Sequence, residues 1–182
     1  MLSLPRKFID FLFTKHFDRQ YFNKLENPLL YDVAIHHLDL VRYLTENEAA
    51  SVLAKNFSPK KSWFAGNSAA YAFIELKDGV CVKYNGNLVV QKQETDWLGD
   101  WLIEGTEGII KVEDHQLKLI TNGEIKTESY QDDLYLEKSV QQFIEYLETG
   151  KEPKTLASDY IKTQALINFI EKSSGAGKLI KL

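Results

Sequence analysis

Apolar and polar residues alternate through much of the first two thirds of the chain. Residues 7–17 place Ile9, Phe11, Phe13 and Phe17 at every second position. Alternation of this kind is typical of a β-strand with one buried face. Further runs with strand character follow at residues 50–57, 69–77, 80–85, 87–93, 100–105, 108–113, 116–121 and 124–130. Asp78 and Gly79 separate two of these runs, and this dipeptide predicts a tight hairpin.

The spacing of apolar residues becomes helical in three places, which are residues 30–45, 133–148 and 158–173. There the apolar side chains recur three and four positions apart. Ser158 or Asp159 is the expected N-cap of the last helix, and Gly175 and Gly177 are expected to end it. The chain then closes with KLIKL, which predicts a short strand.

One helix, a series of antiparallel strands and two further helices predict an α+β fold. We expect a large, open, mainly antiparallel sheet with helices on one face. Residues 1–182 are long enough for one domain with a substantial core, and no internal repeat divides them. The sequence therefore predicts a single domain.

Composition and charge narrow the choice of partners. The chain is 44% hydrophobic and 26% charged, as globular proteins are, and its net charge is −4. This balance argues against nucleic acid or an anionic membrane as the main partner. No apolar run reaches the ~20 residues that span a bilayer. Cys81, the only cysteine, lies between Val80 and Val82. We expect it to be buried in a strand, and the lack of an intrachain disulfide favours the cytoplasm.

Residues 30–45 separate into two faces on a helical wheel drawn at about 100° per residue. The polar stripe contains Asp32, His36, Asp39 and Tyr43. The apolar stripe contains Leu30, Val33, Ala34, Leu40, Val41 and Leu44, with His37 among them. We expect His37 to face the core as a neutral imidazole with one hydrogen-bond partner. His36, its neighbour, is expected on the polar face.

The spacing of Asp32 and His36 suits acid–base chemistry. Residues four apart are neighbours on a helix surface, so the carboxylate can accept the imidazole N–H and fix its tautomer. His36 would then be a competent general base toward a hydroxyl group. Two other interpretations stay open. Asp32 caps the helix and His36 is an ordinary surface residue, or both join Asp39 in a metal site, which needs at least one further ligand.

Three segments resemble, in the same order, one family of oxidoreductases. They are NPLLYDVAIHHLDLVRYLT at 27–45, YNGNLVVQKQETDWLGDWLIEGTEGIIKVED at 84–114 and TGKEPKTLASDYIKTQALINFIEKSSGAGKLIKL at 149–182. These segments are similar to the C-terminal domain of the Gfo/Idh/MocA family (glucose–fructose oxidoreductase, inositol dehydrogenase, MocA). The likeness covers nearly the whole chain from residue 27 onward.

The resemblance implies an NAD(P)-dependent enzyme that acts on a sugar, polyol or related small molecule. The family's catalytic Asp-x-x-x-His falls on Asp32 and His36. His36 would be the general base on the substrate hydroxyl while hydride leaves the adjacent carbon, and Asp32 would orient it. Asp39 matches a recurrent family position and is expected to be structural. The open sheet face often forms the family's subunit interface, so we expect a homodimer or tetramer.

The chain departs from the family because it lacks the first half. Family members begin with a Rossmann domain whose Gly-x-Gly-x-x-Gly turn binds the dinucleotide, and this sequence has no such run. Gly105 and Gly108 indicate a hairpin turn, and SSGAGK at 173–178 follows a helix. The family's catalytic lysine also belongs to the missing part. We expect the parent enzyme to use NAD or NADP, and this chain alone to bind no cofactor and to be inactive.

Two features allow more than one interpretation. Trp97 and Trp101 either line a sugar site or pack in a subunit interface, and we favour the interface. The chain is either the substrate-binding and catalytic half of a dehydrogenase or a stand-alone, non-catalytic oligomerisation or ligand-binding module. Intact Asp32 and His36 favour the first function, and the missing dinucleotide motif keeps the second open.

Overall fold

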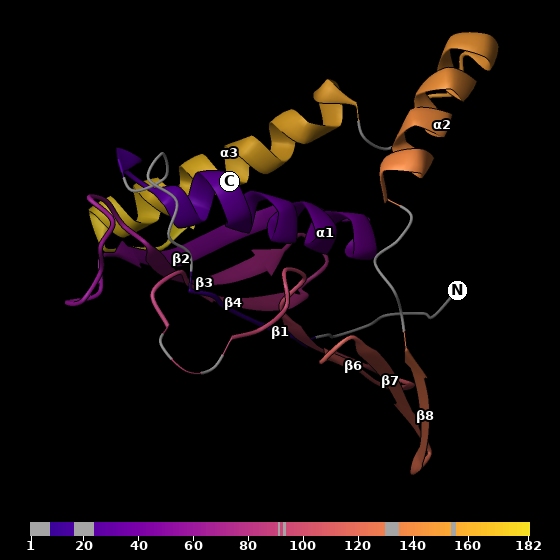
Figure 1. The fold of residues 1–182 in the computed structure, drawn as a ribbon, viewed down its shortest axis with the longest axis horizontal. Coiled ribbons are helices and arrows are strands. Elements are labelled where there is room, and N and C mark those ends of the chain that lie inside the picture. Colours follow the sequence, from indigo (N-terminus) through magenta and orange to yellow (C-terminus); the bar gives the residue numbers. More distant parts are fainter. Residues whose placement is uncertain (1–7, 17–23, 91, 93, 130–134, 154–155) are drawn as a thin grey trace.

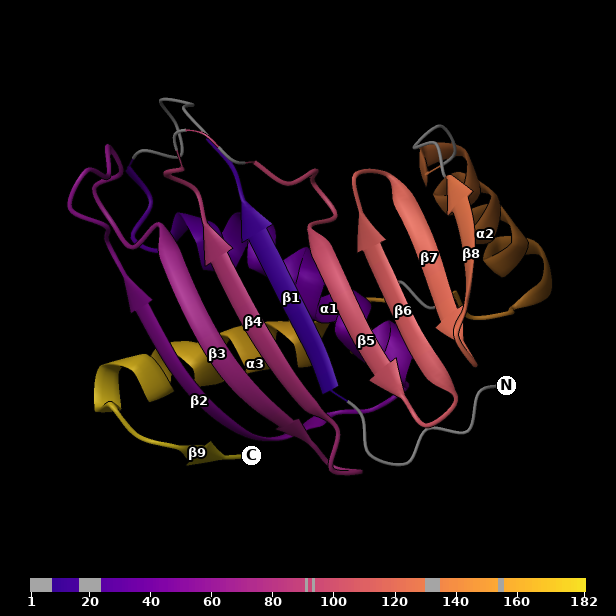
Figure 2. The same ribbon diagram turned by 90° about the horizontal axis from the view of Figure 1, so that it is seen from below.

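A computed structural model describes residues 8–16, 24–90, 92, 94–129, 135–153 and 156–182, with backbone alone over 135–139. Over these ranges one nine-stranded sheet has the strand order β8-β7-β6-β5-β1-β4-β3-β2-β9 (Figure 2). The strands are β1 (Phe8–Thr14), β2 (Ala49–Phe57), β3 (Ala69–Leu76), β4 (Cys81–Asn87), β5 (Asp100–Gly105), β6 (Gly108–Glu113), β7 (Gln116–Thr121), β8 (Glu124–Ser129) and β9 (Ile180–Lys181). The helices are the π-helix η2 (Leu29–Ala34) and the α-helices α1 (Ile35–Thr45), α2 (Tyr135–Thr149) and α3 (Ala157–Ala176).

The sheet is antiparallel except at its centre, where β1 runs parallel to β4 and antiparallel to β5. Strand β1 therefore joins the group β2–β4 to the group β5–β8. The hairpin predicted at Asp78-Gly79 joins β3 to β4. Gly79 adopts a φ of +84°, and the Val80 N–H donates to the Asp78 carboxylate at 3.2 Å, which closes the turn.

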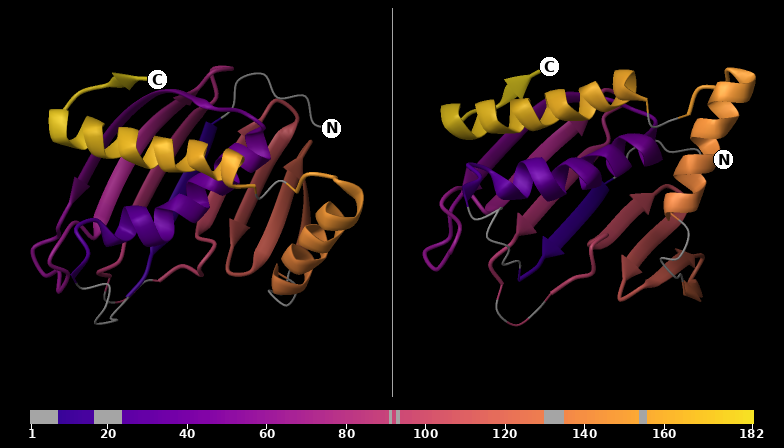
Figure 3. Two further views of the ribbon diagram at one scale, coloured as in Figure 1. Left: turned by 90° about the horizontal axis from the view of Figure 1, so that it is seen from above. Right: turned by 45° about the horizontal axis from the view of Figure 1, so that its top comes forward.

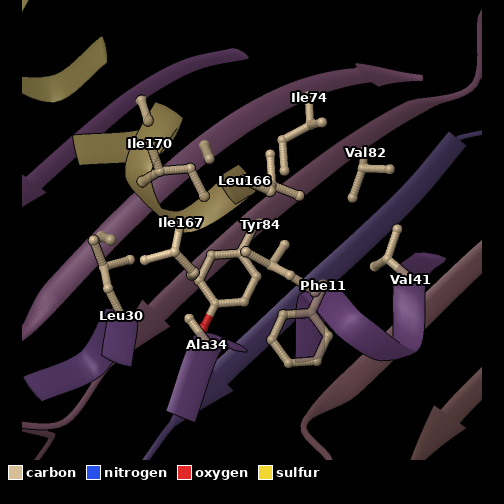
Figure 4. Close-up of a cluster of buried hydrophobic side chains, with 14 of the residues drawn as sticks. Phe11, Leu30, Ala34, Val41, Ile74, Val82, Tyr84, Leu166, Ile167 and Ile170 are labelled. Carbon is tan, nitrogen blue, oxygen red and sulfur yellow. The ribbon is translucent and has the colours of Figure 1, made fainter. Parts of the chain in front are cut away.

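Helices cover one face of the sheet, as the sequence predicted (Figures 1 and 3). The segment η2–α1 and helix α3 lie over β1 to β4. Burial alternates along β1, with Ile9, Phe11 and Phe13 almost completely buried on the helix side. Figure 4 shows Leu166, Ile167 and Ile170 of α3 and Val41 of α1 packed over Tyr84, Val82 and Ile74. This apolar layer is the core that fixes the position of α1.

Helix α2 lies apart from this core, beyond β8 (Figures 1 and 3). Its apolar positions Val140, Phe143, Ile144 and Leu147 are between 47% and 67% exposed. The helical period of residues 133–148 therefore predicts the helix over Tyr135–Thr149 correctly. It does not predict whether the apolar face of this helix is buried. None of the described helices is long and apolar enough to cross a membrane.

Several local expectations are wrong. The strand expected over 87–93 is wrong for residues 88–90 and 92, because β4 ends at Asn87 and Val89 makes only an isolated bridge, to His16. Residues 91 and 93 lie outside the described residues. Neither Ser158 nor Asp159 caps α3, whose N-cap is Leu156 without a side-chain hydrogen bond. Gly175 lies inside α3, and Gly177, with a φ of +61°, ends it.

Two expectations concern single side chains. Cys81 does lie on a strand, but its side chain is exposed on the face opposite the helices. Successive side chains of a strand point to opposite faces of the sheet, so the next residue, Val82, is the one that is buried under the helices. Phe17 lies outside the described residues.

Arg42 ties α1 to α3 and to the start of β2. Its side chain is only 6% exposed. Its Nε and Nη2 donate to Glu48 at 2.9 and 2.8 Å, and Nη2 also donates to Asp159 at 2.9 Å. Its Nη1 donates to Thr163 at 2.7 Å. Mainly through these hydrogen bonds, the guanidinium holds the pKa of the Glu48 and Asp159 carboxyl groups below their ordinary values.

Replacing Arg42 by Met keeps much of the side-chain volume but removes the donor that these partners share. We expect the free energy of unfolding to fall by about 2–3 kcal/mol, because hydrogen bonds to charged groups contribute roughly 1.5–3 kcal/mol each and the half-exposed carboxylates regain water. Urea unfolding followed by circular dichroism measures this loss.

Lys162→Met is the matched control. The Lys162 side chain is 54% exposed and its ammonium lies 3.5 Å from both Glu48 and Asp159, so the loss should stay within about 0.5 kcal/mol. Because the folded-state pKa values of Glu48 and Asp159 lie below 4.5 and 3.8, the Arg42 contribution should begin to fall below these pH values and be lost as the pH passes through the lower folded-state values. An Arg42→Met variant as stable as the wild type at pH 7 would show that the network is dispensable.

Candidate functional site

The segment η2–α1 buries one face with a period of four. Leu29, Val33, His37 and Val41 are buried, as are Leu30, Ala34 and Leu38 in the next column. A regular α-helix has 3.6 residues per turn, so a column of period four would rotate away from the sheet. The π-helical turn at η2 takes more residues and lessens this rotation. Residues four apart thus keep nearly the same direction across the junction.

Asp32 and His36 share the opposite side of this segment. Asp32 is half-buried within η2, and His36 is exposed in the first turn of α1. The structure therefore places both residues as the helical wheel predicted, with His36 toward solvent. Single π turns inside helices occur frequently at functional sites. The role of the two residues in chemistry is not decided by their placement.

His37 points the other way, into the core, as predicted. It is 4% exposed and lies between the rings of Phe11 and Phe13, with centroids 4.5 and 4.9 Å away. Burial, the largest cause, lowers its pKa to about 4, so the ring is neutral at pH 7. Its Nε2–H donates to the Trp97 carbonyl at 2.9 Å, because a carbonyl can only accept. Its Nδ1 then accepts from the Tyr84 hydroxyl at 3.4 Å.

Polar contacts to α3 hold η2 in place. Glu171 of α3 accepts hydrogen bonds from the Asn27 amide and the Tyr31 hydroxyl, which flank the start of η2. Burial and the Glu171 carboxylate raise the pKa of Tyr31 to about 12, so its hydroxyl keeps its proton. Asn27 also accepts from Asn56 at 2.6 Å and from Asn67 at 3.0 Å. The backbone that carries Asp32 is therefore fixed from two sides.

Trp97 and Trp101 have opposite surroundings. Trp101 is 4% exposed on the helix side of β5, where its ring meets Phe11 at 4.5 Å and its Nε1–H donates to the Leu98 carbonyl. It is a core residue, so the interface expectation is wrong for it. Trp97 lies in the connection before β5, and its side chain is 51% exposed. The carbonyl of Trp97 is the one that His37 binds.

Asp39 has the structural role expected of it. It follows His36 by three residues and accepts a hydrogen bond from Thr163 at 2.6 Å and one from Arg42 at 3.3 Å. Among the side chains that the structure describes, no three His, Cys, Asp or Glu residues are grouped to hold a metal ion. A groove of about 690 Å³ lies at this Arg42 end, between α1 and α3. It is not lined by His36.

The glycine runs do not fit a dinucleotide site. Such a site needs a Gly-rich turn that leads from a strand into a helix. Gly105 and Gly108 instead close the β5–β6 hairpin, as predicted. Gly175 and Gly177 lie at the C-terminal end of α3, where the helix dipole disfavours phosphate.

The helical wheel identified the two histidines but not the residues that hold them. Tyr84, Trp97 and Glu171 contact η2–α1 from 47 to 140 residues away in the chain. Tyr84 alternates with Val82 in a predicted strand, which indicates burial but not the contact with His37.

Known proteins share this fold. The chain is similar to an oxidoreductase from Agrobacterium radiobacter, solved in complex with NAD+, L-tartaric acid and magnesium, with 20% identity and a TM-score of 0.85. The match covers 96% of this chain and 56% of that protein. It is also similar to an aldose-aldose oxidoreductase from Caulobacter crescentus complexed with glycerol, with 17% identity, a TM-score of 0.78 and coverage of 98% and 55%. The chain thus spans little more than half the length of these structures.

A curated relative and a family model complete the comparison. The uncharacterized protein y4oX of Sinorhizobium fredii is 21% identical over 98 residues, which are 53% of this chain and 27% of that protein. Residues 16–182 match the model described as the oxidoreductase family, C-terminal alpha/beta domain. The match includes η2, α1 and all the strands except β1. The chain therefore belongs to the Gfo/Idh/MocA oxidoreductase family, of which it is essentially the C-terminal α/β domain.

Proposed function

We propose that this chain is the substrate-binding and catalytic half of an NAD(P)-dependent oxidoreductase that acts on a sugar or polyol. The observation that carries the proposal is an exposed His36 one turn after Asp32, within a domain of this family. His36 takes the proton from a substrate hydroxyl, and Asp32 orients the imidazole. NAD or NADP, held by a second domain, supplies the hydride chemistry. We expect the protein to act in the cytoplasm. Its only cysteine, Cys81, is an exposed free thiol, and free thiols without disulfides are typical of reducing compartments.

The molecules bound in similar structures support the substrate class. L-Tartaric acid accompanies NAD+ in the Agrobacterium radiobacter structure, and glycerol is bound in the Caulobacter crescentus structure. Both are small molecules with several hydroxyl groups. A general base on a hydroxyl suits such a substrate, and we extend this class to the present chain.

A second candidate function is a stand-alone, non-catalytic oligomerisation or ligand-binding module. The sheet face opposite the helices favours it. Leu12, Leu53, Phe57, Tyr71 and Phe73 are each 37–53% exposed there. Leu53 and Phe73 are directly paired across β2 and β3, and Phe57 and Tyr71 have ring centroids 6.1 Å apart. Exposed apolar clusters such as the one on β2 and β3 favour an interface, and both candidate functions share our expectation of a homodimer or tetramer built on this face.

Cofactor binding by the 182-residue chain tests whether a second domain is needed. We expect no saturable binding of NADH at micromolar concentration, since the described glycines form no strand-to-helix phosphate turn. Titration followed by NADH fluorescence measures it, with an intact dehydrogenase as the positive control. Tight, saturable binding would mean that this chain holds its own dinucleotide site and would overturn the two-domain arrangement.

Substitution of His36 tests the chemistry. In a longer protein that joins this chain to a dinucleotide-binding domain, His36→Ala should lower kcat by about 100-fold or more, the usual contribution of a general base. His115→Ala is the matched control, because His115 is also exposed but lies in the β6–β7 turn. Steady-state rates with polyol substrates measure the effect. An unchanged rate in the His36 variant would remove this residue from the mechanism and favour the non-catalytic module.

A charge on the open sheet face tests the subunit interface. Phe73→Lys should weaken self-association by about 30-fold or more, as expected for a hot-spot residue in an apolar interface. Ile161→Lys places the same charge at a 66% exposed apolar residue on α3 and should leave association unchanged. Sedimentation velocity over a range of concentrations measures both. A wild-type chain that stays monomeric, or equal effects of the two variants, would contradict an interface on this face.

A further inference from the structure

His37 is a buried polar residue that the proposed chemistry does not use. An imidazole in an apolar site is unfavourable unless its nitrogens find partners. Here the better of its two hydrogen bonds, at 2.9 Å, goes to a backbone carbonyl in a different element, that of Trp97. The ring thus links the first turn of α1 to the connection that precedes β5. A leucine at this position would fill the core without that link.

The backbone around Trp97 is held at further points. The Thr95 N–H donates to the Thr14 carbonyl at 2.8 Å, at the end of β1. The Leu98 N–H donates to the Asp96 carboxylate at 2.8 Å, and the Leu98 carbonyl accepts from Trp101 at 2.7 Å. Every residue from 95 to 98 therefore takes part in a hydrogen bond through its backbone or side chain.

Gly99 closes this connection under a steric constraint. Its φ is +73°, and a Cβ atom there would lie 2.5 Å from the Phe11 ring. The chain can pass so close to the core only without a side chain. The conformation that presents Trp97 is therefore set by its neighbours on both sides.

The indole of Trp97 is nevertheless half exposed. One part of the ring faces Phe13, with centroids 6.0 Å apart, and the Lys15 ammonium lies 5.8 Å from the ring centroid. Single exposed apolar residues are ordinary. An exposed indole whose backbone is fixed by a buried histidine is less common. Fixing the backbone does not bury the indole, so it adds no apolar packing at Trp97. The flat, electron-rich face of an indole attracts polarised C–H groups such as those of a sugar ring.

We propose that Trp97 is the platform against which the C–H face of a sugar or polyol stacks, and that His37 is the residue that positions it. This inference rests on the proposed function for its ligand class. His36 and His37 are consecutive, with Cα atoms about 3.8 Å apart. One rigid helical turn thus carries both the proposed base and the anchor of the platform, so their separation is fixed by the fold.

The positioning role is tested by fluorine NMR of the chain labelled with 5-fluorotryptophan. The chain has three tryptophans and should therefore give three resonances. His37→Gln keeps an N–H that can donate to the Trp97 carbonyl, whereas His37→Leu has no donor. We expect the Trp97 resonance to keep its position and width in the Gln variant and to shift and broaden in the Leu variant. The Trp63 resonance serves as the internal reference for folding. Equal spectra of the two variants would overturn the positioning role.

The platform role is tested by saturation-transfer NMR with myo-inositol and D-glucose as probes. Trp97→Ala should reduce transfer to the C–H protons by about fivefold or more, the scale of one aromatic stacking contact. Tyr43→Ala, at an aromatic residue that is 55% exposed near the other end of α1, should leave it unchanged. Absence of transfer to the wild type, or equal transfer to wild type and Trp97→Ala, would overturn the platform.

This readout needs neither cofactor nor turnover, so it is independent of the proposed reaction. The corresponding test of the reaction is the rate of His36→Ala in a longer protein, in which kcat should fall by about 100-fold or more. Retained transfer in Trp97→Ala together with a lost rate in His36→Ala would remove the platform and leave the proposed function intact. Loss of transfer in Trp97→Ala with an unchanged rate in His36→Ala would support the platform and contradict the proposed role of His36.

Discussion

The packing of η2–α1 against the central strands is the constraint on which the candidate site depends. Strands β1 and β4 are the one parallel pair among the described strands, and their buried residues Phe11 and Tyr84 form the surface that receives His37. Adjacent residues on a helix point about 100° apart. The buried columns that contain His37 and Leu38 occupy one side of the segment, and His36 lies outside them, toward solvent. The direction of the proposed base thus follows from the packing of the whole segment.

Local periodicity was enough to predict the hairpins, the alternation of β1 and the opposite directions of His36 and His37, because each depends on residues close in sequence. It was wrong for Leu44, which was placed on the apolar stripe and is 46% exposed. Failure at 87–93 has a physical reason. Leu88 enters the core and Val89 finds only a single bridging partner, whereas apolar residues in a row indicate a strand only where a neighbouring strand is available. The place of β1 beside β4, about 70 residues away, is likewise a property of the whole fold.

The same limit explains which site residues were missed. The sequence made no prediction for Arg42, because its partners Asp159 and Thr163 lie 117 and 121 residues further along the chain. Trp97 and Trp101 were both predicted to lie in a subunit interface, because they lie four residues apart in a single motif. The turn at Gly99, with its positive φ, separates a half-exposed connection from a buried strand. Backbone conformation, not composition, decides the difference.

The two ends of α1 are held by different kinds of contact, and this difference separates stability from the candidate chemistry. The Arg42 end concentrates the buried charge interactions that join α1, α3 and β2. The His36 end is fixed instead by apolar packing and by two hydrogen bonds, from His37 to the Trp97 carbonyl and from Tyr31 to the Glu171 carboxylate. Changes to the exposed side of that end can therefore leave the charge network around Arg42 undisturbed. The stability of the domain and the direction of the proposed base thus depend on different contacts.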